Sequence, residues 1–401
     1  MSQDNVTVTT NTSWFARIGN AIKGVLVGFV AVLISIVLLS WNEGRSIQSI
    51  RSNNEGARIV VPVGADRIDP ANEGKLVHLT APAAASGART DSQLGVTADG
   101  LLLARSVEYF QWVEKTSTET RTKLGGGEET VTTYSYATEW SSAPVDSSSF
   151  NQPQGHQNPA AAVEAAEFAA ETATLGAFTI DQAVLNQLSA DTPLTISAEQ
   201  AAGISRALSR PATVQDNSVY VGSNAAAPQV GDMKISYRVV PQNTTLSVIG
   251  AQTQNTLRPF PTKAGSNLLM VRKGTASAQE MFQAAKAANQ TLTWILRGVG
   301  ILAAIIGFSM ILGPLGVLGD VVPFIGSLVR MGTGLISGVL GIALSLIVIA
   351  VSWIVFRPLV GIILLVIAGA ILGGIFFLRK KKASRLRTHS QKSTVAARAM
   401  A

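Results

Sequence analysis

The residues best suited to chemistry lie beside aromatic side chains in the middle of the chain. Glu114 and Glu139 could act as acid and base, because such catalysis needs titratable groups within hydrogen-bond reach of one substrate. Tyr134 and His156 could bind or orient a ligand. A simpler interpretation is that His156 and Asn158 cap a following helix. We therefore treat the first four only as a candidate surface site, and predict no catalytic residues.

The cysteine and histidine content excludes several kinds of chemistry. The chain of 401 residues contains no cysteine, which rules out disulfides, thiolate catalysis and iron–sulfur clusters. His78, His156 and His389 are its three histidines, and they do not fall in an HExxH or similar pattern. We therefore predict no metal, no cofactor and no enzymatic activity.

Four apolar segments lie towards the two ends of the sequence, and they determine where the large central domain lies. A helix rises 1.5 Å per residue, so about 20 apolar residues cross the hydrocarbon core of a bilayer. The mean hydropathy of +0.30 agrees with that amount of lipid-embedded chain. We predict four transmembrane helices, one N-terminal and three C-terminal, over residues 24–41, 294–315, 331–356 and 359–378.

The first of these segments differs from a cleaved signal peptide. Its apolar run is longer than the usual 7–15 residues and ends at Trp41 rather than at small residues. We predict an uncleaved signal anchor. Residues 316–330 are apolar but contain Pro323 and Asp320, which favours an interfacial helix in the cytosol over a fifth crossing.

Charge predicts the orientation of the chain. The tail over 379–401 begins with Arg379, Lys380, Lys381 and Lys382 and contains no acidic residue. Directly after a spanning helix, basic residues favour a cytosolic anchor over nucleic-acid binding. Four crossings then place residues 1–23, predicted to be disordered, in the cytosol, and residues 42–293 outside it.

The large domain is predicted to be α+β with a mainly antiparallel sheet. Alternating apolar and aromatic residues over 101–115 and 129–141 predict a long hairpin. Pro159 and the alanine-rich run after it predict a helix over 160–173. Three Asn-Glu-Gly triplets, beginning at Asn42, Asn54 and Asn72, predict turns. The remaining predictions are helices over 181–188, 198–208 and 277–290 and strands over 58–63, 75–80, 219–221, 232–240, 245–253 and 267–273.

Inside the predicted spans, the pattern favours packing over transport. Arg297 and Arg357 lie near span ends, where long side chains reach water as anchors. No buried acid is expected, which argues against a transporter, and no polar stripe suggests a channel. Small residues at helical spacing predict close helix packing at Gly24, Gly28, Gly334, Gly338, Ser345, Gly369 and Gly373.

An ordered set of short motifs resembles the transmembrane protein 43 family, also called LUMA. No single motif is specific, but together they run from the first span to the last. They are Trp41-Asn42-Glu43-Gly44-Arg45, Asn72-Glu73-Gly74-Lys75-Leu76-Val77-His78, Tyr109-Phe110-Gln111-Trp112-Val113-Glu114, Tyr134-Ser135-Tyr136, Glu139-Trp140, Gly155-His156, Asn158-Pro159, Val230-Gly231-Asp232 and Phe356-Arg357-Pro358-Leu359. The alanine-rich region and the tail depart from the family pattern.

The resemblance implies a multi-pass membrane protein that organises membrane protein complexes and self-associates. For a eukaryotic member it implies the endoplasmic reticulum and inner nuclear membrane, with emerin and lamins as partners. For a bacterial member, which we favour, it implies the cytoplasmic membrane and a periplasmic domain.

Two functions follow as expectations. The first is a non-enzymatic membrane scaffold that binds lipids, copies of itself and other membrane proteins, but no nucleic acid. The alternative is a lipid-binding protein or an enzyme at the membrane surface that uses the extracytosolic domain.

Overall fold

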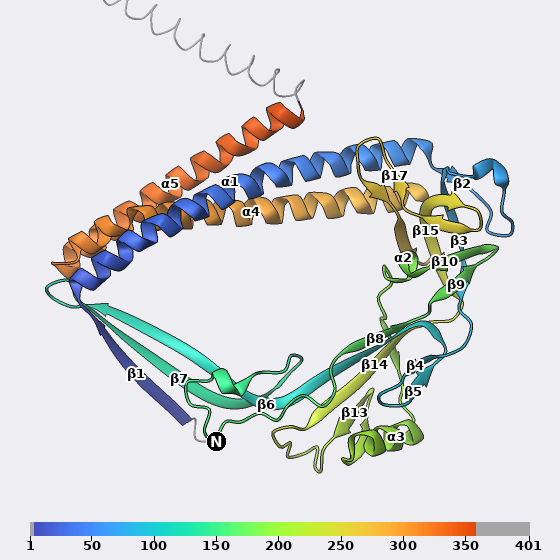
Figure 1. Cartoon of the computed structure of the whole chain (residues 1–401), viewed down its shortest axis with the longest axis horizontal. Helices are drawn as coiled ribbons and strands as arrows, with labels where there is room; N and C mark the ends of the chain where they lie inside the picture. Colours follow the sequence, from blue (N-terminus) through green and yellow to red (C-terminus); the bar gives the residue numbers. More distant parts are fainter. Residues whose placement is uncertain (1–3, 358–401) are drawn as a thin grey trace, which may run out of the picture. The chain divides into compact units, whose positions relative to one another are not determined.

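The computed structural model describes residues 4–357, which form two compact units. The β unit comprises the described part of Met1–Gly19, together with Gln48–Thr291 and Val317–Ser327. The helical unit comprises Asn20–Ile47, Leu292–Gly316 and the described part of Leu328–Ala401. Figure 1 traces the chain through the elements of both units. Each unit is described by itself below.

Three long helices supply the helical unit, and their ends extend beyond it. They are α1 (Trp14–Ile59), α4 (Ala278–Gly319) and α5 (Pro323–Phe356). Each is long and apolar enough to cross a bilayer, which confirms an integral membrane protein with one N-terminal and two C-terminal apolar helices. The predicted fourth span over 359–378 and the basic tail lie outside the described residues.

Serine caps begin two of these helices. The Ser13 side chain accepts a hydrogen bond from the Ala16 N–H at the start of α1. Ser277 and Glu280 form a reciprocal capping box at the start of α4, which confirms the helix predicted over 277–290.

The residues between α4 and α5 do not form the separate interfacial helix that we predicted over 316–330. The fourth helix continues to Gly319, Asp320 caps it, and α5 begins at Pro323. Proline suits the first turn of a helix because its missing N–H would be unpaired there anyway. The segment is therefore the end of one long helix, a short turn and the start of the next.

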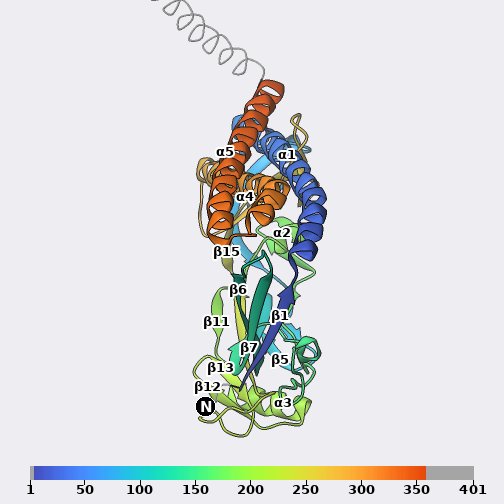
Figure 2. The ribbon, with the colours of Figure 1, turned by 90° about the vertical axis from the view of Figure 1, so that its left-hand side faces the viewer.

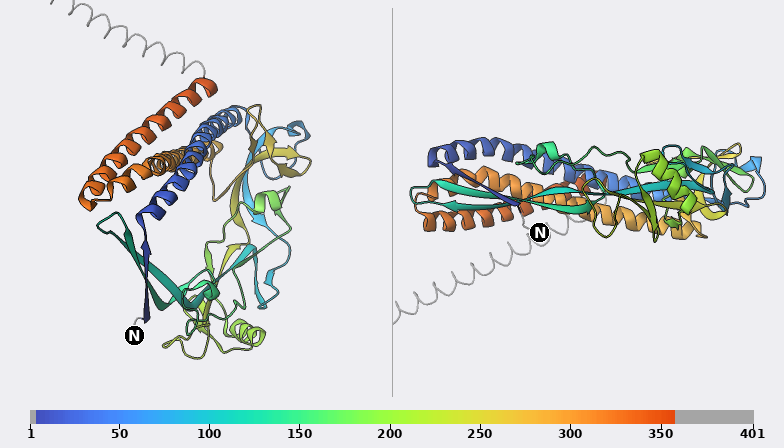
Figure 3. Two further views of the ribbon diagram at one scale, coloured as in Figure 1. Left: turned by 60° about the vertical axis from the view of Figure 1, so that its left-hand side comes forward. Right: turned by 90° about the horizontal axis from the view of Figure 1, so that it is seen from below.

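The larger sheet of the β unit is antiparallel throughout, and the long hairpin predicted from its alternation is confirmed. Its central path is β1 (Asp4–Thr12), β7 (Glu128–Ser141), β6 (Gly100–Thr122), β14 (Met233–Pro241), β13 (Ser218–Val221) and β12 (Ala212–Gln215). Two short strands, β8 (Ala166–Ala169) and β11 (Thr192–Leu194), pair with β6 and β14. Figure 3 shows β6 and β7 as a long ribbon with β1 beside them.

The N-terminal strand corrects the predicted disordered lead. Residues Asp4–Thr12 pair with β7 over nine positions, from Asp4 opposite Tyr136 to Thr12 opposite Glu128. The run of Thr, Asn and Val that looked unstructured has the β-branched content that suits an edge strand. Its order comes from a partner about 125 residues away rather than from local sequence.

The second sheet closes on itself and surrounds an apolar core. Its path is β19 (Met270–Lys273), β15 (Thr244–Thr253), β16 (Thr256–Arg258), β10 (Phe178–Asp181), β9 (Thr172–Leu175), β3 (Leu76–Ala84) and β2 (Val61–Pro62). Because β15 also pairs with β3, five of these strands form a closed circuit. Leu175, Phe178, Ile180 and Val248 are among the fully buried side chains of its core.

Small elements complete the β unit. They are the strand pairs β4 (Arg89–Asp91) with β5 (Val96–Ala98) and β17 (Phe260–Pro261) with β18 (Asn267–Leu268), the 3-10 turns at Pro70–Asn72 and Ser147–Ser149, and the helices α2 (Gln182–Leu185) and α3 (Ala198–Leu208). The α3 helix has the predicted Ser197 cap, completed by Gln200.

Several other secondary-structure predictions are wrong. The helix predicted over 160–173 is instead extended chain that includes β8 and the start of β9, because backbone pairing with β6 and β10 outweighs alanine's helix propensity. Two of the three predicted turns, at Asn42 and Asn54, lie inside α1, and the strand predicted over 58–63 is reduced to β2.

Candidate functional site

Two members of the predicted surface site come together around Tyr136. Glu114 accepts hydrogen bonds from the Tyr136 hydroxyl at 2.7 Å and from the Asn151 N–H at 2.6 Å. His156, only 3% exposed, stacks on the Tyr136 ring at 4.0 Å and meets the edge of Trp112 at 4.7 Å. Burial, and then the hydrogen bond to Glu114, raises the pKa of Tyr136. The cluster therefore fixes the chain after the hairpin onto the sheet.

The other two members do not complete a site with them. Tyr134 lies on the same face of the hairpin, half-buried between Val6 and Thr116 of the neighbouring strands. Glu139 lies on the opposite face, where it pairs with the exposed Lys115 at 2.6 Å. Side chains alternate along a strand, so positions 134 and 139 had to face opposite ways. The four predicted residues are not one constellation.

Asn158 has a role that the helix-cap interpretation did not foresee. No helix follows it; its side-chain oxygen accepts from the Trp112 N–H at 2.7 Å, and its amide donates to the Trp112 carbonyl at 2.9 Å. The side chain thus satisfies both backbone groups of Trp112, as a neighbouring strand would. His156 and Asn158 together attach this loop to β6.

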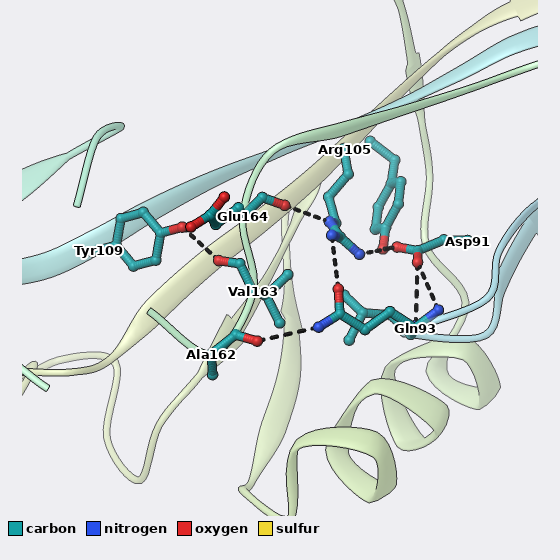
Figure 4. A network of polar contacts seen from close by, with 9 residues as sticks. Asp91, Gln93, Arg105, Tyr109, Ala162, Val163 and Glu164 are labelled. Carbon is teal, nitrogen blue, oxygen red and sulfur yellow. Dashed lines mark hydrogen bonds and ion pairs between the residues drawn. The ribbon is translucent and has the colours of Figure 1, made fainter. Parts of the chain in front are cut away.

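A second buried polar network holds β4 to the large sheet (Figure 4). Asp91 is fully buried and accepts from the Arg105 guanidinium at 2.5 Å and from the Tyr237 hydroxyl at 2.6 Å. Its other oxygen accepts from the Gln93 and Leu94 N–H groups. Burial, followed by the bond to Asp91, raises the pKa of Tyr237. Every contact of this carboxylate stabilises the fold, which makes it unavailable as a general base.

Arg105 is equally committed to structure. Besides Asp91, it donates to the Gln93 side chain at 2.9 Å and to the Glu164 carbonyl at 2.8 Å. Burial also raises the pKa of the nearby Tyr109, whose hydroxyl donates to the Val163 carbonyl. The extended chain before β8 is therefore held by side chains from β6.

A third network surrounds Asp232 at the start of β14. The Tyr220 hydroxyl and the Arg210 guanidinium both donate to the Asp232 carboxylate. Burial, and next the bond to Asp232, raises the pKa of Tyr220 to about 12. Beside it lies a cavity of about 60 Å³, lined in part by Tyr109, Gln111 and Arg210. Ligand pockets usually measure about 300–1,000 Å³, so this one suits water rather than a substrate.

The helical unit contains a buried acid, Glu43, just beyond the predicted first span over 24–41. Glu43 is 2% exposed and accepts two hydrogen bonds from Arg297, at 2.6 and 2.9 Å. The Trp353 indole N–H also donates to Glu43, at 2.8 Å. One group from each of α1, α4 and α5 thus meets at a single carboxylate, and Figure 2 shows these helices alongside one another. We call Glu43, Arg297 and Trp353 the helix lock.

Aromatic rings and amides surround the helix lock. The Arg297 guanidinium lies 4.7 Å from the Trp294 ring centroid, and the Arg357 guanidinium lies 5.7 Å from that of Trp353. Directly before Glu43 in the sequence, the fully buried Asn42 donates to the Thr293 carbonyl at 3.1 Å. These contacts place Arg297 within a polar layer between helices. Membrane anchoring by Arg297 and Arg357 stays a prediction.

The predicted packing residues fall into three groups. A side chain at Gly28 would lie 2.6 Å from the Gly307 carbonyl, so α1 and α4 approach closely there, and Ser345 is buried and donates to the Gly341 carbonyl of its own helix. In contrast, nothing lies within 4 Å of a side chain added at Gly24, Gly334 or Gly338. Gly369, Gly373 and the anchor residues Arg379, Lys380, Lys381 and Lys382 lie outside the described residues.

The helix lock could not be found from local sequence. Glu43 and Arg297 are 254 residues apart, and Glu43 follows the apolar run where a charge would ordinarily face water. The signal that was present is the Trp41-Asn42-Glu43-Gly44-Arg45 motif, which is too polar for a span end and is continuous with the helix. Among the described residues, no group of three His, Asp or Glu side chains could hold a metal ion.

Comparison with known proteins gives one consistent result. The family model described as "Transmembrane protein 43" matches residues 109–358. Transmembrane protein 43 of Homo sapiens is 30% identical over 370 residues, which cover 89% of this chain and 91% of the human protein. The Drosophila melanogaster "Transmembrane protein 43 homolog" is 28% identical over 354 residues, covering 86% and 92%. No solved structure matches.

The matched region includes the β6–β7 hairpin from Tyr109, the Asp232 network and two of the three helix-lock residues. The similarity to the human protein extends over most of both chains, as the ordered motifs of the sequence led us to expect. The chain therefore belongs to the transmembrane protein 43 family.

Proposed function

We propose that this protein is a non-enzymatic membrane scaffold that self-associates and organises other membrane proteins. The observation that carries the proposal is the helix lock, because a buried carboxylate, its arginine counter-ion and a tryptophan join three helices. Interhelical polar contacts of this kind hold helices in register inside lipid. A scaffold needs helices that keep fixed positions relative to one another, because its binding surfaces then keep the same shape.

The state of the other candidate groups supports the same proposal. Glu114, Asp91 and Asp232 each accept several hydrogen bonds from the fold itself. A general base needs a free lone pair directed at a substrate. The carboxylates that could do chemistry are instead occupied with holding loops to sheets.

Apolar surface on the helices offers the contacts that a scaffold requires. An apolar groove of about 470 Å³ lies along one face of α1, and lipid tails or another helix could fill it. It is lined by Val30, Leu33, Ile34, Val37, Leu38 and Trp41. Membrane lipids are therefore proposed as constant partners.

Self-association is proposed to use α5. Leu335 and Val339 are 68% and 67% exposed, and Leu346 continues their face at helical spacing. Gly334 and Gly338, which have open space around them, lie next to this face. Large apolar side chains beside glycines allow a second helix to approach closely in lipid.

A cysteine scan tests this proposal in native membranes, because the natural chain contains no cysteine. Single cysteines are placed at each position from 334 to 347 and oxidised. We expect the yield of cross-linked dimer to rise at every third or fourth position and to be highest on the face of Leu335, Val339 and Leu346. Uniformly absent cross-linking, with monomers alone in native mass spectrometry, would refute self-association.

Ile347→Cys provides the matched control. Ile347 is 60% exposed but points about 100° away from Leu346 on the helix. Its cross-linking should be weak if one face forms the contact. Equal cross-linking at both positions would indicate random collision rather than a defined interface.

We further propose that the protein lies in the cytoplasmic membrane of a bacterium, with the β unit outside the cytosol. The three apolar helices and the family support the membrane location.

A further inference from the structure

We propose that the N-terminal segment, the tip of the β6–β7 hairpin and the α4–α5 turn form a clasp that keeps all three on the same side of the membrane as the β unit. The clasp comprises residues 4–19, 121–129 and 317–322. This assignment departs from the orientation predicted by charge, in which residues 1–23 and 42–293 lie on opposite sides.

Strand pairing is the first argument. Nine successive residues of β1 pair with β7, and β7 pairs in turn with β6. Paired strands lie about 4.8 Å apart, whereas the hydrocarbon core of a bilayer is about 30 Å thick. Backbone hydrogen bonds cannot form across that distance. The two strands must therefore lie on one side.

A buried arginine is the second argument. Arg17 is 8% exposed and donates to the Asp320 carboxylate at 2.5 Å and to the Gly126 carbonyl at 2.6 Å. It also pairs with Glu128 at 3.0 Å. Asp320 is fully buried. One side chain from the start of α1 thus joins the hairpin tip to the α4–α5 turn.

Trp14 supplies the third argument. Its indole N–H donates to the Val317 carbonyl at 2.9 Å, and its ring occupies the space beside Gly126. A side chain at Gly126 would lie 2.3 Å from that ring, and the residue has a φ of +81° that favours glycine. The Gly125 N–H donates to the Val321 carbonyl at 3.1 Å. The hairpin tip is therefore shaped to receive both segments.

Charge alone favours the other orientation, because Arg17 and Lys23 precede an apolar run. In the clasp, however, Arg17 is neutralised by Asp320 and Glu128 and no longer contributes a free positive charge. Lys23 is then the one remaining unneutralised positive charge, of these two, that favours a cytosolic N-terminus.

Disulfide trapping in the otherwise cysteine-free full-length chain tests the pairing. Val8 lies opposite Thr132, and opposed residues in antiparallel strands have Cα separations that a disulfide can bridge. We expect Val8→Cys with Thr132→Cys to form an intramolecular disulfide in native membranes. The matched control, Val8→Cys with Thr138→Cys, is about 20 Å out of register and should stay reduced.

Labelling with a membrane-impermeant thiol reagent tests the side. Thr10→Cys reports the N-terminal segment, Thr97→Cys reports the β unit, and Ser393→Cys reports the tail. We expect the first two to react from the same side in intact cells and in inverted vesicles. Labelling of Thr10→Cys from the side opposite to Thr97→Cys would overturn the proposal. So would an absent disulfide at positions 8 and 132, or one found only between two copies of the chain.

Discussion

Arg105 with Asp91 in the β unit and Arg297 with Glu43 in the helical unit are both buried ion pairs, with closest N–O distances of 2.5 and 2.6 Å. Their surroundings differ. Asp91 and Arg105 also bind backbone groups, an amide side chain and a tyrosine, whereas Glu43 and Arg297 face mainly tryptophan rings. The first pair joins β4 and the chain before β8 to the large sheet. The second sets the register of helices that already pack through apolar surface.

This difference predicts how each pair responds to removal. Replacing a buried ion pair by apolar side chains of similar volume is often neutral or stabilising. The replacement is costly when the same charged groups also satisfy backbone donors and acceptors, because these then become unpaired. The helix lock should therefore tolerate an apolar replacement that the Asp91 network does not.

The largest effect is expected in the β unit. Asp91→Ala should lower the free energy of unfolding by about 4–5 kcal/mol, because it leaves Arg105 and the Gln93 and Leu94 N–H groups without their acceptor. Adding Arg105→Met should not restore stability. Unfolding of the full-length protein in detergent, followed by circular dichroism, measures both variants. If the double variant regained stability, the Asp91–Arg105 pair would respond to apolar replacement in the same way as the Glu43–Arg297 pair.

A somewhat smaller effect is expected in the helical unit. Glu43→Ala should cost about 3 kcal/mol, because Arg297 remains buried without its counter-charge. Combining Glu43→Leu with Arg297→Met, which replaces the pair by apolar side chains of similar volume, should return stability to within about 1 kcal/mol of the natural chain. The same unfolding assay applies. A double variant no better than the single one would contradict the register role assigned to the helix lock.

Alkaline pH should weaken the β unit alone, because all five tyrosines lie there. Tyr220 has its pKa raised from 10.0 to about 12, so the folded state holds this proton more tightly than the unfolded state. Its contribution is complete below pH 10 and is lost between pH 10 and about 12. The loss amounts to about 2–3 kcal/mol, since each pKa unit corresponds to about 1.4 kcal/mol.

Stability measured at several pH values, with tyrosinate absorbance as the second signal, tests this dependence. Tyr220→Phe is the control, and its stability should fall less steeply in that interval. An unchanged slope in the control would mean that other groups, such as Tyr237, account for the alkaline loss.

The smallest effect compares two glycines on α1. Gly28→Ala should destabilise the protein by about 1–2 kcal/mol, because the new methyl group would lie 2.6 Å from the Gly307 carbonyl. Gly24→Ala, where nothing lies within 4 Å, should be neutral or slightly stabilising because alanine favours a helix. The thermal unfolding midpoints of the two variants test this prediction. Equal shifts in the midpoint would contradict the close approach of the helices at Gly28.

The sequence predicted features that depend on local periodicity. The β6–β7 hairpin was recognisable because Tyr134, Tyr136 and Trp140 alternate with polar residues. The apolar runs identified three helices, although α1 extends well beyond residues 24–41 at both ends. The Ser197 cap placed α3 correctly.

The errors came from contacts between distant residues. Alanine-rich residues around Ala166 looked helical, but they occupy an edge of β6, where backbone hydrogen bonds outweigh propensity. Asn42 looked like a turn residue, yet its amide donates to Thr293 inside the helical layer. Glu139 was grouped with His156 although the alternation of side chains already separated them. The ion pairs of Arg17, Arg105 and Arg297 join separate segments of the sequence, so local periodicity does not predict them.

The separation of Glu43 and Arg297 also has a consequence for synthesis. At about 5–20 residues per second, a ribosome needs roughly 10–50 s to add the 254 residues that separate them. Throughout that time α1 has been made but its counter-ion has not. During biogenesis the Glu43 carboxylate must therefore be stabilised without Arg297. Water at the lipid surface or an insertion factor can provide that stabilisation. The final arrangement of the helices is consequently a late, post-insertion event.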